Sequence, residues 1–245
     1  MIAIIHTIIM NTNSDSLRSG DVSLRKVALT AGVALALMTL IAPFANFYVL
    51  AKLIVAGDGA STAENILAAE GLFRLGAISL LVVVILDIIV AWGLWVLLIP
   101  VNKSLSLLAA WFRIIYAAIF AVAIANLFHA LEWVNSPEYL QVFEPGQIHA
   151  QVLLSVETFQ KEWDLGLIIF GCHLLVLGFL LYKADFVPRV IGILVVIAGA
   201  GYFVNGFIHS LYPGANTGFL MFTFIGEVVF LFWLLIKGPR LKDPE

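Results

Sequence analysis

The sequence predicts an all-α fold of the polytopic membrane class: a six-helix transmembrane bundle with short external amphipathic helices. Composition is the first reason. The 245-residue chain is 62% hydrophobic and only 12% charged, with a mean hydropathy of +1.05, far from the usage of soluble globular domains. The second reason is that its apolar residues gather in stretches long enough to cross about 30 Å of hydrocarbon as helices.

Six apolar stretches define the expected spans. We place them at about 27–55, 75–99, 105–131, 165–182, 190–208 and 219–236. All six belong to one transmembrane domain over residues 24–238. Residues 1–23 form a polar N-terminal tail that starts with a short apolar extension, and residues 239–245 form a C-terminal tail. The single cysteine, Cys172, lies inside a span, so no intrachain disulfide is possible.

Basic residues indicate how the chain is oriented. One set of segment ends carries nine of them: Arg18, Arg25, Lys26, Lys103, Lys183, Arg189, Lys237, Arg240 and Lys242. The opposite ends carry only Lys52, Arg74 and Lys161. Because basic residues collect on the cytoplasmic side, we predict a multi-pass protein of the inner (cytoplasmic) membrane with both termini cytoplasmic. The lipid bilayer is then its main partner, an oligomer is compatible with the pattern, and a net charge of −3 argues against nucleic acid.

The two long external connections are predicted to contain helices. In the first, Ser61 and Glu64 fit a capping box, so a helix is expected to begin near Thr62. In the second, apolar residues recur at helical spacing between Ile148 and Trp163. This spacing predicts an amphipathic helix on the outer surface, serving either as a stabilising surface helix or as a lid over an outward-facing cavity.

Four ionisable residues inside the apolar stretches are the main functional clue. They are Asp87, Arg113, His173 and Glu227. The last three each lie ten positions from a flanking lysine, about 15 Å at the helical rise, and Asp87 lies at a similar depth. A charge near the bilayer midplane costs at least about 2.5 to 3.5 kcal/mol on insertion scales, so such residues usually face a bundle interior and find partners. We therefore expect an intramembrane polar centre.

Asp87 and Arg113 are expected to be partners, because consecutive helices joined by a short turn should be adjacent and antiparallel. The pair could fix helix register or could take part in transport or proton movement. His173 could be a hydrogen-bonded core residue or a functional group. Glu227 has no cation on its own helix, so it either receives one from a neighbouring helix or remains protonated.

A secondary polar face is expected near the external ends of the third and fifth spans. It comprises Tyr202, Asn205, His209, Asn126 and His129. The fifth span also carries glycines seven residues apart, at positions 192, 199 and 206, which suits close contact with another helix. Gathering of the external histidines around zinc is chemically conceivable, but no short histidine spacing supports it. No metal and no cofactor are predicted.

The order of several residues resembles a prokaryotic membrane family. In the first half these residues are Gly57, Asp58, Asn65, Phe73, Arg74, Pro100, Val101, Asn102, Phe112 and Arg113. In the second half they are Phe170, Gly171, His173, Phe186, Pro188, Arg189, Gly199, Tyr202, Gly226, Glu227, Trp233 and Gly238. This succession resembles the family called domain of unknown function 4386, with a departure at Trp95, where that pattern has a tyrosine. The resemblance covers about residues 25–238 and implies a six-helix membrane protein without assigning an activity.

Three functional classes are compatible with the sequence. The first is a small-solute or proton-linked transporter or channel built around the polar centre. The second is a membrane-embedded enzyme that acts on a lipid or other apolar substrate through a carboxylate with a histidine or metal. The third is a structural or partner-binding membrane subunit. The chain contains no G-x-S-x-G elbow, phosphate loop or dinucleotide fingerprint, and we favour the transporter class.

Overall fold

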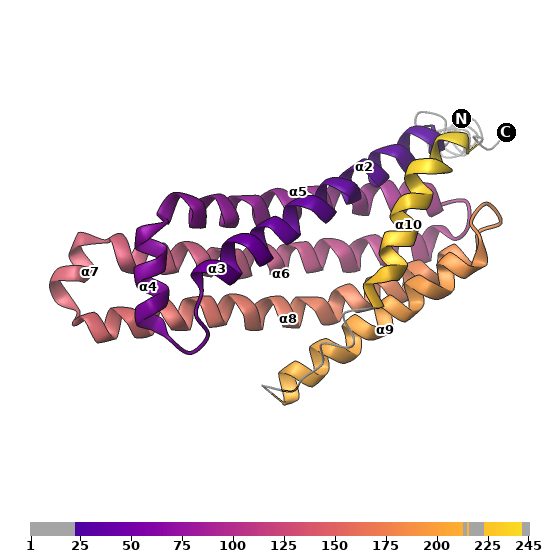
Figure 1. Cartoon of the computed structure of the whole chain (residues 1–245). Coiled ribbons are helices and arrows are strands. Elements are labelled where there is room, and N and C mark those ends of the chain that lie inside the picture. The colour runs from indigo at the N-terminus through magenta and orange to yellow at the C-terminus, as the bar shows by residue number, and fades with distance from the viewer. Residues whose placement is uncertain (1–22, 213–214, 216–222, 242–245) are drawn as a thin grey trace, which may run out of the picture.

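The computed structural model describes residues 23–212, 215 and 223–241, and every regular element in this part of the chain is helical (Figure 1). The long helices are α5 (Glu70–Leu98), α6 (Lys103–Asn135), α8 (Pro145–Lys183) and α9 (Arg189–Leu211). The first span combines α2 (Leu24–Pro43), a π-helical segment (Phe44–Leu50) and α3 (Ala51–Leu53). The shorter elements are α4 (Gly59–Ala68), α7 (Pro137–Val142), α10 (Ile225–Ile236) and a 3-10 turn (Gly238–Arg240).

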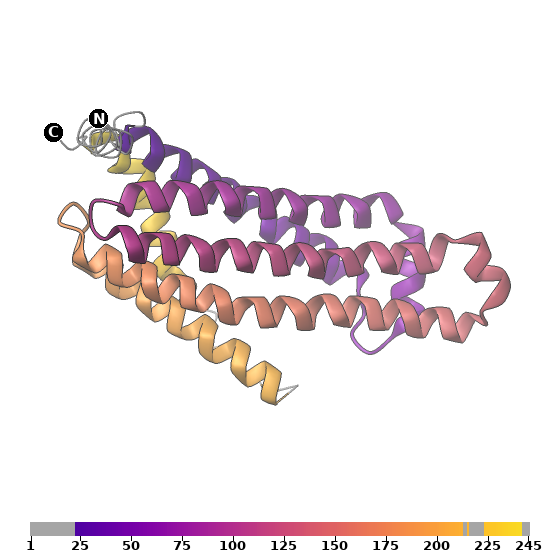
Figure 2. The same cartoon turned by 180° about the vertical axis from the view of Figure 1, so that it is seen from behind.

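Six of these helices pack in a closed ring. Helices α5, α6 and α8 lie side by side as one layer, seen from behind in Figure 2, and α2, α9 and α10 cross the opposite face in Figure 1. Around the ring, α2 packs on α5, α5 on α6, α6 on α8, α8 on α9, α9 on α10, and α10 on α2. The ring has an inner side on which polar groups can be kept away from lipid.

Five helices are long and apolar enough to cross a membrane: the compound helix Leu24–Leu53, α5, α6, α8 and α9. They correspond to the first five expected spans, and an α-helical membrane bundle is confirmed. The sixth expected span, 219–236, starts outside the described residues, and α10 supplies its last twelve positions. The count of six crossings therefore stays a prediction.

A π-helical turn interrupts the first span directly after Pro43. A proline inside a helix removes one backbone hydrogen bond and crowds the preceding turn, and a local change of helical winding relieves that conflict. The Asn46 side chain donates a hydrogen bond of 3.0 Å to the Ala42 carbonyl oxygen across this region. The first span is thus continuous but not uniformly α-helical.

Glycines bring α8 and α9 into backbone contact. Gly171 faces Gly199, and Gly178 faces Gly192. A Cβ atom added at any of the four would lie 2.7–2.9 Å from the carbonyl oxygen of the facing glycine, which a real side chain does not tolerate. The close helix contact expected from the seven-residue glycine spacing is confirmed, and it is made to α8.

The end of the bundle that carries α4 and α7 differs from the expected arrangement. The amphipathic segment around 148–163 is helical, but it does not form a separate surface helix, because α8 runs without a break from Pro145 to Lys183. At 1.5 Å per residue this helix is about 58 Å long, well beyond the hydrocarbon thickness. Helix α4 packs across its projecting part and across α6.

The N-terminal cap of α4 is also different. The helix begins at Gly59, three residues before the expected start, and Asp58 rather than Ser61 is its cap. The Asp58 carboxylate accepts hydrogen bonds from the Ser61 backbone N–H at 3.0 Å and from the Ser61 hydroxyl at 2.6 Å. Both residues suit a helix start, and Asp58 takes the role because Gly57, with φ of 73°, makes the turn just before it.

The two described ends of the chain lie at the same end of the bundle. Gly238, in the last turn, packs against Ala28 in the second turn of α2, and Figure 1 shows both elements together. An even number of crossings, as predicted, would produce this arrangement. Residues 1–22 and 242–245, which include most of the two predicted tails, lie outside the described residues.

Candidate functional site: an intramembrane polar centre

Arg113 and Asp87 are in direct contact in the middle of the bundle. Arg113 Nη2 lies 2.6 Å from Asp87 Oδ1, and the two side chains are only 2% and 1% exposed. The two groups form a buried ion pair in which the guanidinium lies beside the carboxylate without a well-directed hydrogen bond. The short turn after α5, where Asn102 caps α6, sets the two helices antiparallel and places the expected partners together.

His173, from α8, holds the other side of Arg113. Its Nε2 lies 3.2 Å from Arg113 Nη1, and its Nδ1 lies 2.8 Å from the Ala109 carbonyl oxygen. A guanidinium group can only donate, so Nε2 must accept, and Nδ1 must carry the hydrogen that is donated to Ala109. The network therefore fixes a neutral histidine with its proton on Nδ1. It joins α5, α6 and α8 through three buried side chains.

Aromatic rings cover the ion pair. The Phe170 ring centroid lies 5.3 Å from the Arg113 guanidinium carbon. The centroid of the Phe170 ring lies 4.8 Å from that of Tyr116 and 5.4 Å from that of Tyr202. The Tyr116 hydroxyl accepts a hydrogen bond of 3.2 Å from the Trp163 indole. Sequence reasoning assigned no role to Tyr116 and Phe170, although each lies three residues from an ionisable residue on the same helix face.

Glu227 reaches the same region from α10. The preceding residue, Gly226, packs directly against the Leu194 backbone of α9, so α10 approaches α9 closely at this point. The Glu227 carboxyl group interacts with the Tyr202 side chain of α9 and is electrostatically coupled to Arg113 and Asp87. It makes no direct ion pair within the described part of the chain, and it is only partly buried. Asp87, Arg113 and His173 of the expected polar centre are thus in direct contact, whereas Glu227 is linked to them through electrostatic coupling and through Tyr202 of the secondary face.

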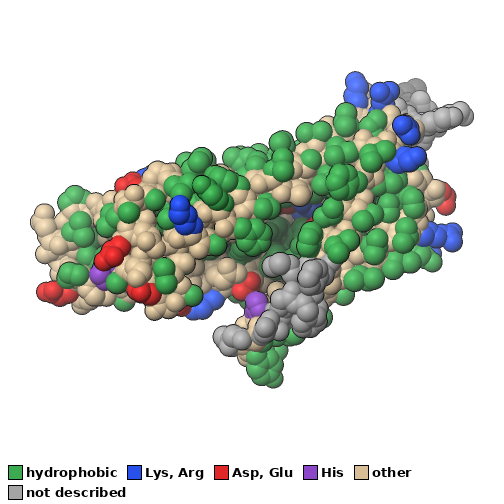
Figure 3. Space-filling model, in the orientation of Figure 1, with side chains coloured by type: hydrophobic (Ala, Val, Ile, Leu, Met, Phe, Trp, Pro, Cys, Tyr) green, Lys and Arg blue, Asp and Glu red, His purple; other side chains and the backbone are tan. Residues whose placement is uncertain are grey.

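The side of the bundle has an opening with charged groups at its floor. Figure 3 shows a hollow in the face formed by α2, α9 and α10, with blue and red side-chain atoms visible at its floor. Several buried polar atoms of the centre have no hydrogen-bond partner among the described residues, notably Asp87 Oδ2 and Arg113 Nε. Buried polar groups are normally satisfied, so unpaired ones call for an explanation.

The remaining residues of the secondary polar face are not brought to one place. His209 Nδ1 lies 3.5 Å from an Asp164 carboxylate oxygen, which links α9 to α8. Asn126 donates a 2.8 Å hydrogen bond to Glu162, which links α6 to α8. Asn205 is partly buried, and His129 is exposed. In the part of the chain that the structure describes, no three His, Cys, Asp or Glu side chains are grouped as metal ligands.

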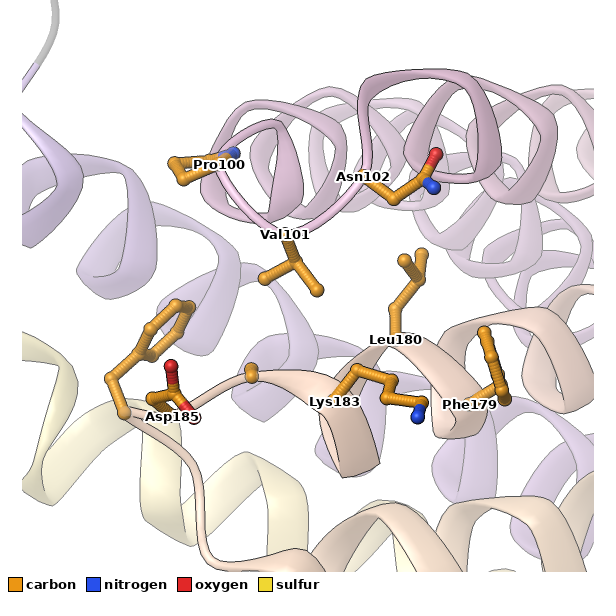
Figure 4. Close-up of a pocket in the computed structure, with 9 residues that line it drawn as sticks. Pro100, Val101, Asn102, Phe179, Leu180, Lys183 and Asp185 are labelled. Atoms are coloured by element: carbon orange, nitrogen blue, oxygen red, sulfur yellow. The ribbon is translucent and has the colours of Figure 1, made fainter.

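A separate cavity lies elsewhere in the bundle. It has a volume of about 550 Å³ and is located where the α5–α6 turn meets the α8–α9 turn (Figure 4). Val101 and Leu180 point into it, and Asn102, Lys183 and Asp185 supply its polar groups. None of the four ionisable residues of the polar centre lines it. We take the polar centre as the candidate site because its charges are buried, whereas this cavity is an open surface hollow.

Fold and site together define a polytopic α-helical membrane protein with charged residues inside its helix bundle. The chain belongs to the family described as Domain of unknown function (DUF4386), which matches residues 30–238. A similar protein is an uncharacterized protein of Archaeoglobus fulgidus, 37% identical over 166 residues that cover 68% of this chain and 85% of the relative. No solved structure matched the chain.

Proposed function

We propose that this protein is a proton-linked transporter of a small solute and that Glu227 is the carboxyl group that gains and loses the proton. The observation that carries this proposal is the contrast between the two intramembrane acids. Asp87 is buried and paired with Arg113, whereas Glu227 is partly exposed and forms no direct ion pair among the described residues. An intramembrane carboxyl group that can be reached from a cavity is the usual element of a proton relay.

The other three residues then serve as the fixed frame of the site. Arg113 is held by Asp87 and His173 at once, so it presents a positive charge at a constant position near Glu227. His173 acts through Arg113, because both of its ring nitrogens are already engaged. This division of roles is more specific than the expectation from the sequence, which left open whether the Asp87–Arg113 pair, His173 or Glu227 has a functional role.

Proton flux into reconstituted vesicles tests the proposal. The full chain is incorporated in liposomes that contain a pH-sensitive dye, and a pH gradient is imposed with valinomycin and potassium to clamp the membrane potential. We expect flux above that of empty liposomes, lost in Glu227→Gln and reduced in His173→Ala. The matched control is Glu157→Gln, which removes an exposed carboxylate of α8 that pairs only with Lys161.

Two results would reject the proposal. The first is wild-type flux equal to that of empty liposomes. The second is full flux in both Glu227→Gln and His173→Ala, which would assign the polar centre to scaffolding. Circular dichroism and gel filtration of each variant establish that a loss of flux does not reflect a loss of fold.

A further inference from the structure

The charges of the polar centre do not balance. Asp87 and Glu227 can contribute two negative charges, and Arg113 contributes one positive charge. His173 adds none, since its Nε2 must accept from Arg113. With Glu227 ionised, the centre lacks one positive charge in a medium where an uncompensated charge is costly. A proton on Glu227 restores neutrality, and so would any ligand that carries a single positive charge.

No other described ionisable group is placed to supply that charge. The titratable groups that interact with Glu227 are Tyr202 on α9, Arg113 and Tyr116 on α6, and Asp87 on α5. Helix α2, which also packs against α10, carries its ionisable residues Arg25 and Lys26 only in its first turn, far along the helix. Within the described residues no further group supplies the missing positive charge, and a mobile species, either a proton or a cationic ligand, can supply it.

Aromatic rings next to Glu227 suit an organic cation better than a metal ion. Tyr202 contacts both the carboxyl group and the Phe170 ring, and Phe170 already stacks on one cation, Arg113. The faces of such rings attract cations, most strongly where water is excluded. A hydrated alkali ion would instead need several oxygen ligands.

The opening is on the side of the bundle, where lipid would be. The helices that form this face expose large apolar side chains to the exterior, among them Leu40 and Phe47 of the first span and Phe207 and Ile225 of α9 and α10. A solute that enters by this route meets a hydrocarbon-like surface before it meets the charged floor. Its body should therefore be apolar and its charge buried or delocalised.

From these observations we propose that the hollow binds a lipophilic monovalent organic cation in exchange for the proton of Glu227. This inference rests on the proposed proton-linked function and names the class of its solute. Asp87 Oδ2, which is buried and lacks a hydrogen-bond partner among the described residues, adds negative potential to the polar centre. No covalent step is involved: one cation enters as one proton leaves.

Isothermal titration calorimetry of the purified full chain with tetraphenylphosphonium tests the inference. Tetraphenylborate, which has nearly the same size and apolar surface but a negative charge, is the matched ligand control. At pH 8 we expect saturable binding of tetraphenylphosphonium and none of tetraphenylborate. Binding should weaken by up to about tenfold per pH unit as Glu227 becomes protonated, with about one proton released per cation at acidic pH.

Variants separate charge from folding. Glu227→Gln should weaken the binding of tetraphenylphosphonium at least about tenfold, a loss of about 1.4 kcal/mol of binding free energy. Glu227→Asp keeps the charge and should retain binding, and Glu157→Gln should bind as the wild type does. Equal binding of both ligands, or binding unchanged by Glu227→Gln or by pH, would overturn the inference. Glu227-dependent proton flux without tetraphenylphosphonium binding would also overturn the inference, but it would leave the proposed function intact. Cation binding without proton flux would instead reject the proposed proton-linked function.

Discussion

At the scale of single residues, Arg113 has more partners than any other charged side chain in the described bundle interior. It contacts Asp87, His173 and the Phe170 ring, on two helices other than its own. A buried ion pair adds little net stability compared with an apolar pair, but removal of one partner leaves the other charge uncompensated. The pair therefore constrains which helices must meet.

This constraint predicts a specific stability pattern. Arg113→Ala should cost about 3–5 kcal/mol of unfolding free energy, because the Asp87 carboxylate loses its partner. The double variant with Asp87→Asn should recover part of that loss. Arg74→Ala removes an exposed pair with Glu70 and should cost about 0–1 kcal/mol. Unfolding midpoints in detergent measure all three, and equal costs for Arg113→Ala and Arg74→Ala would contradict the pairing.

The hydrogen bonds of His173 predict its tautomer. Nitrogen NMR of the ring at neutral pH should report a protonated Nδ1 and an unprotonated Nε2, because Ala109 accepts from one and Arg113 donates to the other. The exposed His129 supplies the reference within the same protein. A ring protonated on both nitrogens would show that the guanidinium contact is absent in solution.

At the scale of helices, backbone contact between α8 and α9 leaves no room for side chains. Gly199→Ala should destabilise the protein by about 1–3 kcal/mol, since the new methyl group would meet the backbone of α8. Gly71→Ala is the matched control, because a Cβ atom there meets nothing within 4 Å. The substitution at Gly71 should be neutral or stabilising. Unfolding midpoints compare the two, and a tolerated Gly199→Ala would contradict the close approach.

The cap of α4 predicts a pH effect outside the membrane. Hydrogen bonds from the Ser61 hydroxyl and backbone N–H hold the pKa of the Asp58 carboxyl below its usual value. A lowered pKa gives a contribution that is present above the unfolded-state pKa and is lost as pH falls through the folded-state pKa. The protection of the amides in the first turn of α4, taken relative to their intrinsic exchange rate at each pH, should therefore fall on acidification. Asp58→Ala should show low protection at every pH, and protection equal to that of the wild type would exclude Asp58 as the cap.

Helix boundaries show where sequence reasoning stops. The depth of Arg113, His173 and Glu227 follows from their distance to flanking lysines, and the Asp87–Arg113 contact follows from the short turn between their helices. The continuity of α8 does not follow from the sequence pattern, because Lys161, Glu162 and Asp164 look like a membrane boundary, although no proline lies between Pro145 and Lys183. The orientation of His173 depends on the Ala109 carbonyl oxygen. A backbone acceptor of this kind cannot be recognised from the order of the side chains.

At the scale of the whole molecule, the two ends of the ring should lie on opposite sides of the membrane. In a Cys172→Ser background, Ser61→Cys in α4 should react with an impermeant thiol reagent in intact cells, whereas Ser104→Cys at the α5–α6 turn should react only after lysis. Ser155, in the connection predicted to be external, is buried and is therefore unsuited as a reporter. The reverse labelling pattern would invert the orientation.

The packing of α8 against α9 has a consequence for assembly. The glycines recur every seven residues on both helices, at 171 and 178 on one and at 192, 199 and 206 on the other. If one helix moved along the other by one repeat, glycine would still face glycine. The glycines therefore allow close contact but do not determine the register of the two helices. The register must be determined by contacts that are made in only one alignment. Asp164 with His209 and Phe170 with Tyr202 fit a single alignment, and that alignment brings Tyr202 to Glu227.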